Sequence, residues 1–205
     1  MAVRRIFALC VVLLTLTACL DPTPVEVTWS RIQDAPVPAW LESWVFAKIE
    51  NVDSDGCEEL SRVIVEQNNI NTAQEAVFWL RKNFEYIRES GDVWFDIKRF
   101  VERGGGDCED WAIAVARLWQ ALGLESYVVI HFNANTIYAH AFAVHAEQEH
   151  LRCATPYAYV QQQFEKLRDA VQYVNAIYQY ELGPYIAIPI EMVGSGAGGS
   201  RIGAR

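Results

Sequence analysis

The spacing of apolar residues changes from helical to strand-like near residue 125, and this change limits the folds open to the chain. Before it, apolar residues recur at intervals of three and four, as in residues 77–87, which predicts amphipathic helices. After it, short segments rich in Val, Ile and Tyr or with alternating polarity predict strands. The predicted strands are residues 125–133, 138–146, 151–155 and 185–192. Helices followed by neighbouring strands favour an α+β domain, with helices packed on an antiparallel sheet.

Helices are predicted for most of the first half of the domain. Residues 39–50 and 57–67 form the first two, and Thr72-Ala73-Gln74-Glu75 is a capping-box pattern that opens a third. A helix after Gly104-Gly105-Gly106 runs to about residue 122, where Gly123 ends it. A long helix over residues 160–178 is predicted from apolar positions at alternating steps of four and three.

The first residues of the chain have the pattern of a secretion signal. Arg4 and Arg5 precede an apolar run of eleven residues, Ile6 to Leu16, which is shorter than the roughly 20 residues of a membrane-spanning helix. The run ends at Leu16-Thr17-Ala18-Cys19, which resembles a bacterial lipoprotein box. Residues 1–18 are therefore predicted to be a lipoprotein signal peptide, and Cys19 the lipidated first residue; the alternative is ordinary cleavage near Ala18.

The remaining boundaries follow from composition. Residues 19–38 contain four prolines and are predicted to tether the domain to the membrane. The folded domain is expected over residues 39–193, and the Gly/Ser-rich residues 194–205 are expected to be disordered. No acidic residue follows Cys19 directly, so we expect a periplasm-facing protein of the bacterial cell envelope, anchored in the outer membrane.

The charge of the chain limits its partners. The formal net charge is −9, and removal of the predicted signal peptide with its two arginines makes it more negative. An acidic surface argues against nucleic acid as a partner. Of the other cysteines, Cys57 and Cys153 either form a disulfide, which an oxidising periplasm permits, or remain buried free thiols.

Cys108 lies where a reactive thiol is expected. It follows Gly105-Gly106-Asp107 and begins the helix that contains Trp111. Backbone N–H groups and the helix dipole at this position favour thiolate over thiol. His140 comes thirty-two residues later on a predicted strand, and this order of residues suits a cysteine nucleophile and its base. His131 is the second choice of base, and His145 is expected on the opposite face of the strand, at the surface.

These residues resemble a known family. Gly-Asp-Cys-Glu-Asp-Trp-Ala at 106–112 and the strand that opens at His140-Ala141 resemble the transglutaminase-like superfamily, in particular its bacterial cysteine peptidase branch. Asn83, Tyr86 and the Asp-x-Trp at 92–94 extend the likeness, which covers about residues 75–156. It implies a papain/transglutaminase-like fold, with N-terminal helices and the nucleophile helix packed on an antiparallel sheet.

The resemblance also implies roles for single residues. Cys108 attacks an acyl carbon, and His140 serves as base and then as acid. The family has an acid on the next strand to orient the histidine, but this sequence has Ala154 and Thr155 there. Thr155 is the candidate polar substitute. Two tryptophans, Trp94 and Trp111, are expected to line the cleft.

A cation is a further implication of the resemblance. Relatives that release adhesins depend on calcium, and the oxygen ligands that Ca²⁺ prefers are present at Asp107, Glu109 and Asp110. The alternative is that these acids stabilise the start of the helix.

The function implied is that of a lipid-anchored cysteine peptidase or amidase acting on a protein or peptide in the cell envelope. Two alternatives remain open. The missing acid favours a catalytically impaired relative that binds protein, and attack by an amine in place of water would give transamidation or peptidoglycan-linked amide chemistry.

Overall fold

The fold is α+β, as predicted. The computed structural model describes residues 32–89, 91–136 and 138–195. A five-stranded antiparallel sheet has the strand order β6-β5-β4-β3-β7. Its strands are β3 (Ser126–Asn133), β4 (Ala139–Glu147), β5 (His150–Thr155), β6 (Ala158–Tyr159) and β7 (Leu182–Pro189). Their bounds agree closely with the predicted ranges, except that β7 begins earlier than predicted and β6 was not foreseen.

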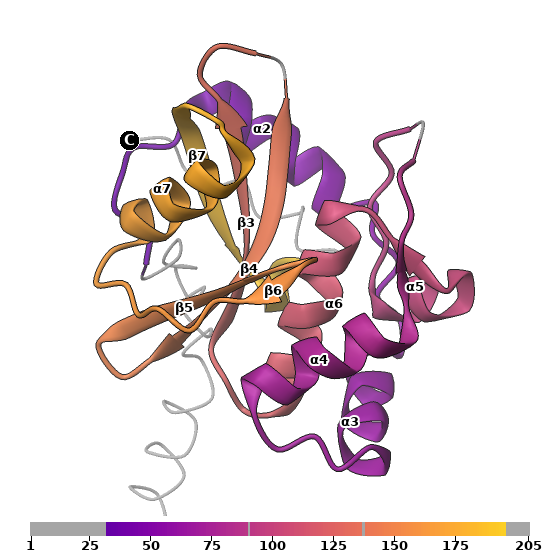
Figure 1. Cartoon of the computed structure of the whole chain (residues 1–205). Helices are drawn as coiled ribbons and strands as arrows, with labels where there is room; N and C mark the ends of the chain where they lie inside the picture. The colour runs from indigo at the N-terminus through magenta and orange to yellow at the C-terminus, as the bar shows by residue number, and fades with distance from the viewer. Residues whose placement is uncertain (1–31, 90, 137, 196–205) are drawn as a thin grey trace, which may run out of the picture.

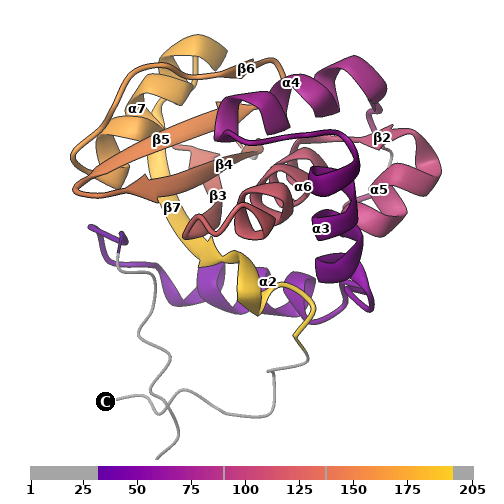
Figure 2. The same cartoon turned by 90° about the horizontal axis from the view of Figure 1, so that it is seen from below.

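Helices surround this sheet. They are α2 (Ala39–Ile49), α3 (Cys57–Gln67), α4 (Ala73–Asn83), α5 (Ile97–Arg103), α6 (Cys108–Ala121) and α7 (Leu167–Tyr178), with a short 3₁₀ turn, η1 (Ile190–Met192). Figure 2 shows α6 at the centre of the molecule, with the sheet on one side of it and α3, α4 and α5 on the other. The helix that begins at Cys108 therefore packs on the sheet, as the resemblance implied.

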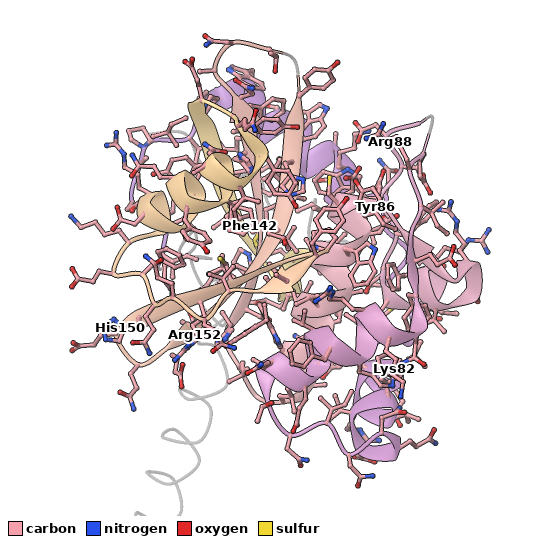
Figure 3. The ribbon with its side chains drawn as sticks, in the orientation of Figure 1. Lys82, Tyr86, Arg88, Phe142, His150 and Arg152 are labelled. Atoms are coloured by element: carbon pink, nitrogen blue, oxygen red, sulfur yellow. The ribbon has the colours of Figure 1, made fainter. Side chains whose placement is uncertain are left out.

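The sheet separates two cores. One contains α6 and the helices around it, and includes Trp119, Val128 and Ala143. The other lies between the sheet and α7, which covers the opposite face (Figure 1). Phe142, labelled in Figure 3, belongs to this second core. Because successive residues of a strand point to opposite faces, each of β3, β4 and β7 supplies both cores.

The helix predicted through residue 87 is shorter than its apolar pattern. The capping box is confirmed, since Thr72 Oγ1 accepts the Glu75 N–H and the Glu75 carboxylate accepts the Thr72 N–H. However, α4 ends at Asn83, and the next residues form β1 (Glu85–Tyr86), which pairs in parallel with β2 (Gly105–Gly106). Strand pairing therefore overrides helical spacing here.

The long helix predicted over residues 160–178 begins only at Leu167. The residues before it extend the sheet: the Val160 N–H donates to Cys153 O, and Phe164 forms a bridge with Leu151. Val160 and Phe164 are still buried in the second core. Because these two residues are buried like those of the helix, they continued its apolar pattern, and the predicted helix therefore began too early.

The last residues of the predicted tether, 32–38, contact the domain. The Gln33 side chain accepts the Ala187 N–H at 2.9 Å. The Asp34 carboxylate accepts the Tyr185 hydroxyl at 2.7 Å and the Arg168 N–H at 3.0 Å. The domain therefore begins before residue 39, at the free edge of β7.

Several predictions lie outside the described residues. These concern residues 1–18, Cys19, the tether up to residue 31, and residues 196–205 of the tail. Among the residues that are described, none of the helices has the length and apolar character needed to cross a membrane.

Candidate active site

Cys108 is the first residue of α6, as predicted, and two glycines explain how it is placed there. Gly105 has φ of +145°, and a Cβ at this position would collide with the carbonyl oxygen of Glu85. A Cβ on Gly106 would collide with the Asp110 side chain. Both positions therefore require glycine, because β2 passes close to β1 and to the first turn of α6. The two glycines fix the backbone directly before the nucleophile.

The thiol of Cys108 does not have the low pKa that its helix position suggests. It donates a hydrogen bond to Glu109 Oε2 at 3.0 Å. Burial and the Glu109 carboxylate raise the pKa of Cys108, and a hydrogen bond from the backbone of Ala141 opposes them only in part. The expected stabilisation of thiolate at the helix start is outweighed, so the resting site holds a protonated thiol.

His140 is buried at the beginning of β4, directly across from His131 on β3. Its ring lies against that of Tyr178, with 4.1 Å between centroids, and its Nε2 has no hydrogen-bond partner among the described residues. Burial, with a smaller contribution from His131, lowers the pKa of His140 to about 3. The imidazole is therefore neutral across the physiological range and able to accept a proton.

One cavity brings the proposed nucleophile and base together. It has a volume of about 370 Å³, and both Cys108 and His140 line it. Trp94 lines it as predicted, whereas Trp111 does not. The prediction for Trp111 was wrong because its ring packs edge-on against Phe100 in the core, with centroids 5.3 Å apart.

Two further tryptophans, which were not among those expected at the cleft, also line the cavity. Trp40 and Trp44 lie on α2, and Phe132 joins them from β3. The helix buries Leu41, Val45 and Ile49 instead of the two tryptophans. An apolar ring that faces a cleft has the same sequence pattern as one that faces the core, which is why these residues were missed.

Thr155 does not orient His140 in this structure. Its hydroxyl accepts the Tyr157 N–H at 3.3 Å, and no hydrogen bond joins it to the imidazole. The neighbour of the imidazole is Tyr178, the last residue of α7. Sequence reasoning missed Tyr178 because it continues the apolar stripe of that helix.

Two of the three acids around Cys108, Glu109 and Asp110, turn to different partners. Asp110 is fully buried and accepts the Phe95 N–H at 2.7 Å, while Glu109 accepts from the thiol. Burial and neighbouring carboxylates raise the pKa of Asp107 to about 8, and burial raises that of Asp110 to about 7. Within the described part of the chain, no group of three or more His, Cys, Asp and Glu residues could hold a metal ion. The arrangement does not fit the calcium site that the resemblance implied.

Other predicted residues take structural positions. Cys57 and Cys153 are free thiols in this structure and are buried in different cores, which agrees with the free-thiol alternative rather than with a disulfide. His145 lies on the opposite face from His140 but is buried against Trp119, at 4.7 Å between centroids, rather than exposed. His131 is fully buried and does not line the cavity.

A thiol at the start of a buried helix, packed on an antiparallel sheet beside a strand histidine, defines a candidate cysteine acyl-transfer site. Residues 59–152 match the family model described as transglutaminase-like superfamily, so this part of the chain is similar to that superfamily. No curated protein matches the chain.

Some solved structures are similar to this chain at low sequence identity. LapG of Legionella pneumophila in its EGTA-treated form is 16% identical, with TM-score 0.40, and the match covers 55% of this chain and 74% of LapG. Another LapG structure is 14% identical over 68% and 88% of the two chains, with TM-score 0.43. A candidate cysteine protease of Cytophaga hutchinsonii is 16% identical, with TM-score 0.43, and the match covers 70% of this chain and 44% of that protein. Because these TM-scores are below 0.5, the site is argued from its own residues.

Proposed function

We propose that the chain is a cysteine peptidase or amidase that acts on a protein or peptide substrate of the cell envelope. The observation that carries the proposal is the single cavity that both Cys108 and His140 line. A thiol and a neutral imidazole at one cavity are the groups that thiol acyl transfer requires.

The proposed reaction has two stages. His140 takes the proton of the Cys108 thiol as the sulfur attacks the carbonyl carbon, and the backbone N–H of Cys108 donates to the resulting oxyanion. The C–N bond then breaks as His140 passes its proton to the leaving amine. Water attacks the thioester, its proton goes to the imidazole, and release of the acid restores the thiol.

The resting site must change before this reaction can begin. The thiol proton lies toward Glu109, and no hydrogen bond joins Cys108 to His140 in the structure. A substrate that displaces the Glu109 carboxylate would remove the neighbour that disfavours the thiolate. The missing orienting acid is expected to slow turnover rather than abolish it, since loss of that group in a serine protease costs about 10⁴-fold.

The activity proposal is tested by alkylation of Cys108 in the full chain. The rate with iodoacetamide is measured from pH 4 to 9 by mass spectrometry of the Cys108 peptide, for the wild type and for His140→Ala. Because His140 takes the thiol proton in the proposed attack, we expect His140→Ala to react more slowly than the wild type over this range, although the raised pKa of Cys108 makes both rates increase toward pH 9.

His150→Ala is the matched control, because His150 is the first residue of β5 and does not line the cavity (Figure 3). It should behave like the wild type. A Cys108 that titrates as an ordinary thiol and is indifferent to His140→Ala would refute the proposed pair.

The proposed location is the outer membrane, facing the periplasm, with the chain anchored through lipid on Cys19 after removal of residues 1–18. The lipoprotein-box pattern supports it. Incorporation of labelled palmitate should require Cys19, and Cys19→Ala should release the protein from the membrane fraction. Incorporation of labelled palmitate into the Cys19→Ala protein would contradict the proposal.

A non-catalytic binding protein is the second candidate. It is favoured by the unpartnered Nε2 of His140 and the protonated thiol. Cys108→Ala should then complement a deletion strain fully, whereas a peptidase would lose function. Transamidation is distinguished by whether an added amine is joined covalently to the acyl group.

A further inference from the structure

Four aromatic rings form one side of the cavity beside Cys108. We call this set the aromatic wall; it consists of Trp40, Trp44, Trp94 and Phe132. Neighbouring rings meet edge to face, with centroids 5.2 Å apart for Trp40 and Phe132 and 5.6 Å apart for Trp44 and Phe132. Trp44 and Trp94 are also 5.6 Å apart. These contacts hold the rings in fixed positions around the cavity.

The charged groups at this cavity already have partners. Asp92 forms an ion pair with Lys48 at 2.7 Å and accepts the Trp94 Nε1–H at 3.1 Å. Glu109 accepts from the Cys108 thiol. A charged substrate side chain would have to compete with these contacts, whereas an apolar one would leave them intact.

Trp40 shows that part of the wall is incompletely covered. It is 54% exposed, although it lies one residue from the fully buried Leu41 and contacts Phe132. A large aromatic side chain left in water at the mouth of a cavity offers apolar area that a ligand can cover. The cavity volume of about 370 Å³ lies within the range of small-molecule sites, roughly 300–1,000 Å³.

We infer that the aromatic wall receives an apolar, preferably aromatic, side chain of the peptide substrate next to the bond that Cys108 attacks. This inference rests on the proposed function, since it places the substrate by reference to the nucleophile. It defines the substrate class by the chemistry of the wall: a bulky apolar residue is favoured, and a charged residue at this position is rejected.

The test compares two alkylating reagents on the full chain. In each, the Cys108 sulfur attacks the CH₂ carbon, the C–I bond breaks, iodide leaves and the thiol proton passes to a base. N-benzyl iodoacetamide adds a phenyl group that can occupy the wall, and iodoacetamide lacks it. We expect the benzyl reagent to alkylate Cys108 about ten times faster, by analogy with other apolar pockets.

Trp40→Ala removes the exposed ring and should reduce this preference, measured as the ratio of the two alkylation rates, to threefold or less. Phe78→Ala is the matched control, because Phe78 is 49% exposed on α4 and does not line the cavity. It should keep the full preference. Equal rates with the two reagents in the wild type, or an unchanged preference in Trp40→Ala, would overturn the inference.

The outcome is separable from that of the proposed function. A benzyl preference together with indifference to His140→Ala would support the wall and refute the catalytic pair. If Cys108 reacts with neither reagent, the aromatic wall is tested by measuring the binding of N-benzylacetamide through the change in tryptophan fluorescence. Saturable binding that Trp40→Ala weakens would uphold the inference, and the absence of saturable binding would overturn it.

Discussion

The phenol ring of Tyr178 lies 4.1 Å from the imidazole of His140, measured between centroids and tilted by 48°. The histidine therefore has an aromatic neighbour, while its Nε2 lacks the hydrogen-bonded acid that the family resemblance implies. A phenol ring restrains the imidazole by packing, but it stabilises a positive charge much less than a carboxylate does. The contact favours a neutral, positioned base.

Replacing Tyr178 with Ala should admit water to the imidazole. Burial holds the pKa of His140 at about 3, so solvation should move it up toward the ordinary value of 6.5. A histidine NMR titration of the full chain measures this shift. Tyr178→Phe keeps the ring and should keep the low pKa. A Tyr178→Ala protein whose His140 still titrates below pH 4 would show that the ring does not control its solvation.

Replacing Glu109 with Gln should make Cys108 more acidic. The substitution removes a negative charge beside the sulfur, and that charge is one reason why the thiol pKa is raised. We expect iodoacetamide to alkylate Cys108 about tenfold faster at pH 7, which corresponds to one unit of pKa. Glu102→Gln is the charge-matched control, because the Glu102 side chain is exposed on α5, and it should react like the wild type. A slower reaction in Glu109→Gln would mean that Glu109 assists the nucleophile.

His131 should make the protein sensitive to acid. It is fully buried with both ring nitrogens unpartnered, and burial lowers its pKa from 6.5 to about 4. Between these values the unfolded chain binds more protons than the folded one. The free energy of unfolding therefore falls as the pH drops from about 6.5 to 4, by roughly 3 kcal/mol for this group.

Urea denaturation at pH 7 and pH 4.5 tests this expectation. Between the two pH values, the free energy of unfolding of His131→Phe should fall by about 2 kcal/mol less than that of the wild type. The buried carboxyls Asp107 and Asp110 have raised pKa values and act in the opposite direction, but they are present in both proteins. An equal loss of unfolding free energy in the two proteins would show that His131 does not cause the acid sensitivity.

Gly105→Ala should disrupt the segment that positions the nucleophile. The added methyl group would collide with the Glu85 carbonyl, which is backbone and cannot turn aside. We expect a loss of several kcal/mol in the free energy of unfolding, measured with urea. Gly123→Ala is the control: it also has positive φ but nothing near its Cβ, and should cost about 1 kcal/mol. A similar loss of unfolding free energy in both variants would show that the positive φ, and not the collision with Glu85, causes the destabilisation.

The sequence predicted the main elements because their patterns are local. The capping box at Thr72, the helix start at Cys108 and the alternation in residues 139–147 each depend on neighbours a few positions apart. The errors arose where distant segments decide the outcome. Pairing with Gly105 and Gly106 ended α4 early, and the bridge from Phe164 to Leu151 delayed α7.

The candidate site was predictable in its residue types and less so in its contacts. The thiol and the histidine could be named from spacing, and both line the cavity. The hydrogen-bond partner of the thiol could not be named from spacing, because the bond to Glu109 depends on the direction of the side chains. Tyr178 and Trp40 come from helices far away in the sequence, and each resembles a core residue in its local pattern.

The attachment of Gln33 and Asp34 has a mechanical consequence. These side chains join the incoming chain to the backbone of β7, to the Tyr185 hydroxyl and to the first turn of α7. A pull on the chain ahead of residue 32 would act on these hydrogen bonds, and through them on β7 and α7, before it reached α2. Because β7 pairs with β3, and β3 with the strand of His140, the sheet takes this load ahead of the helix that carries Trp40 and Trp44.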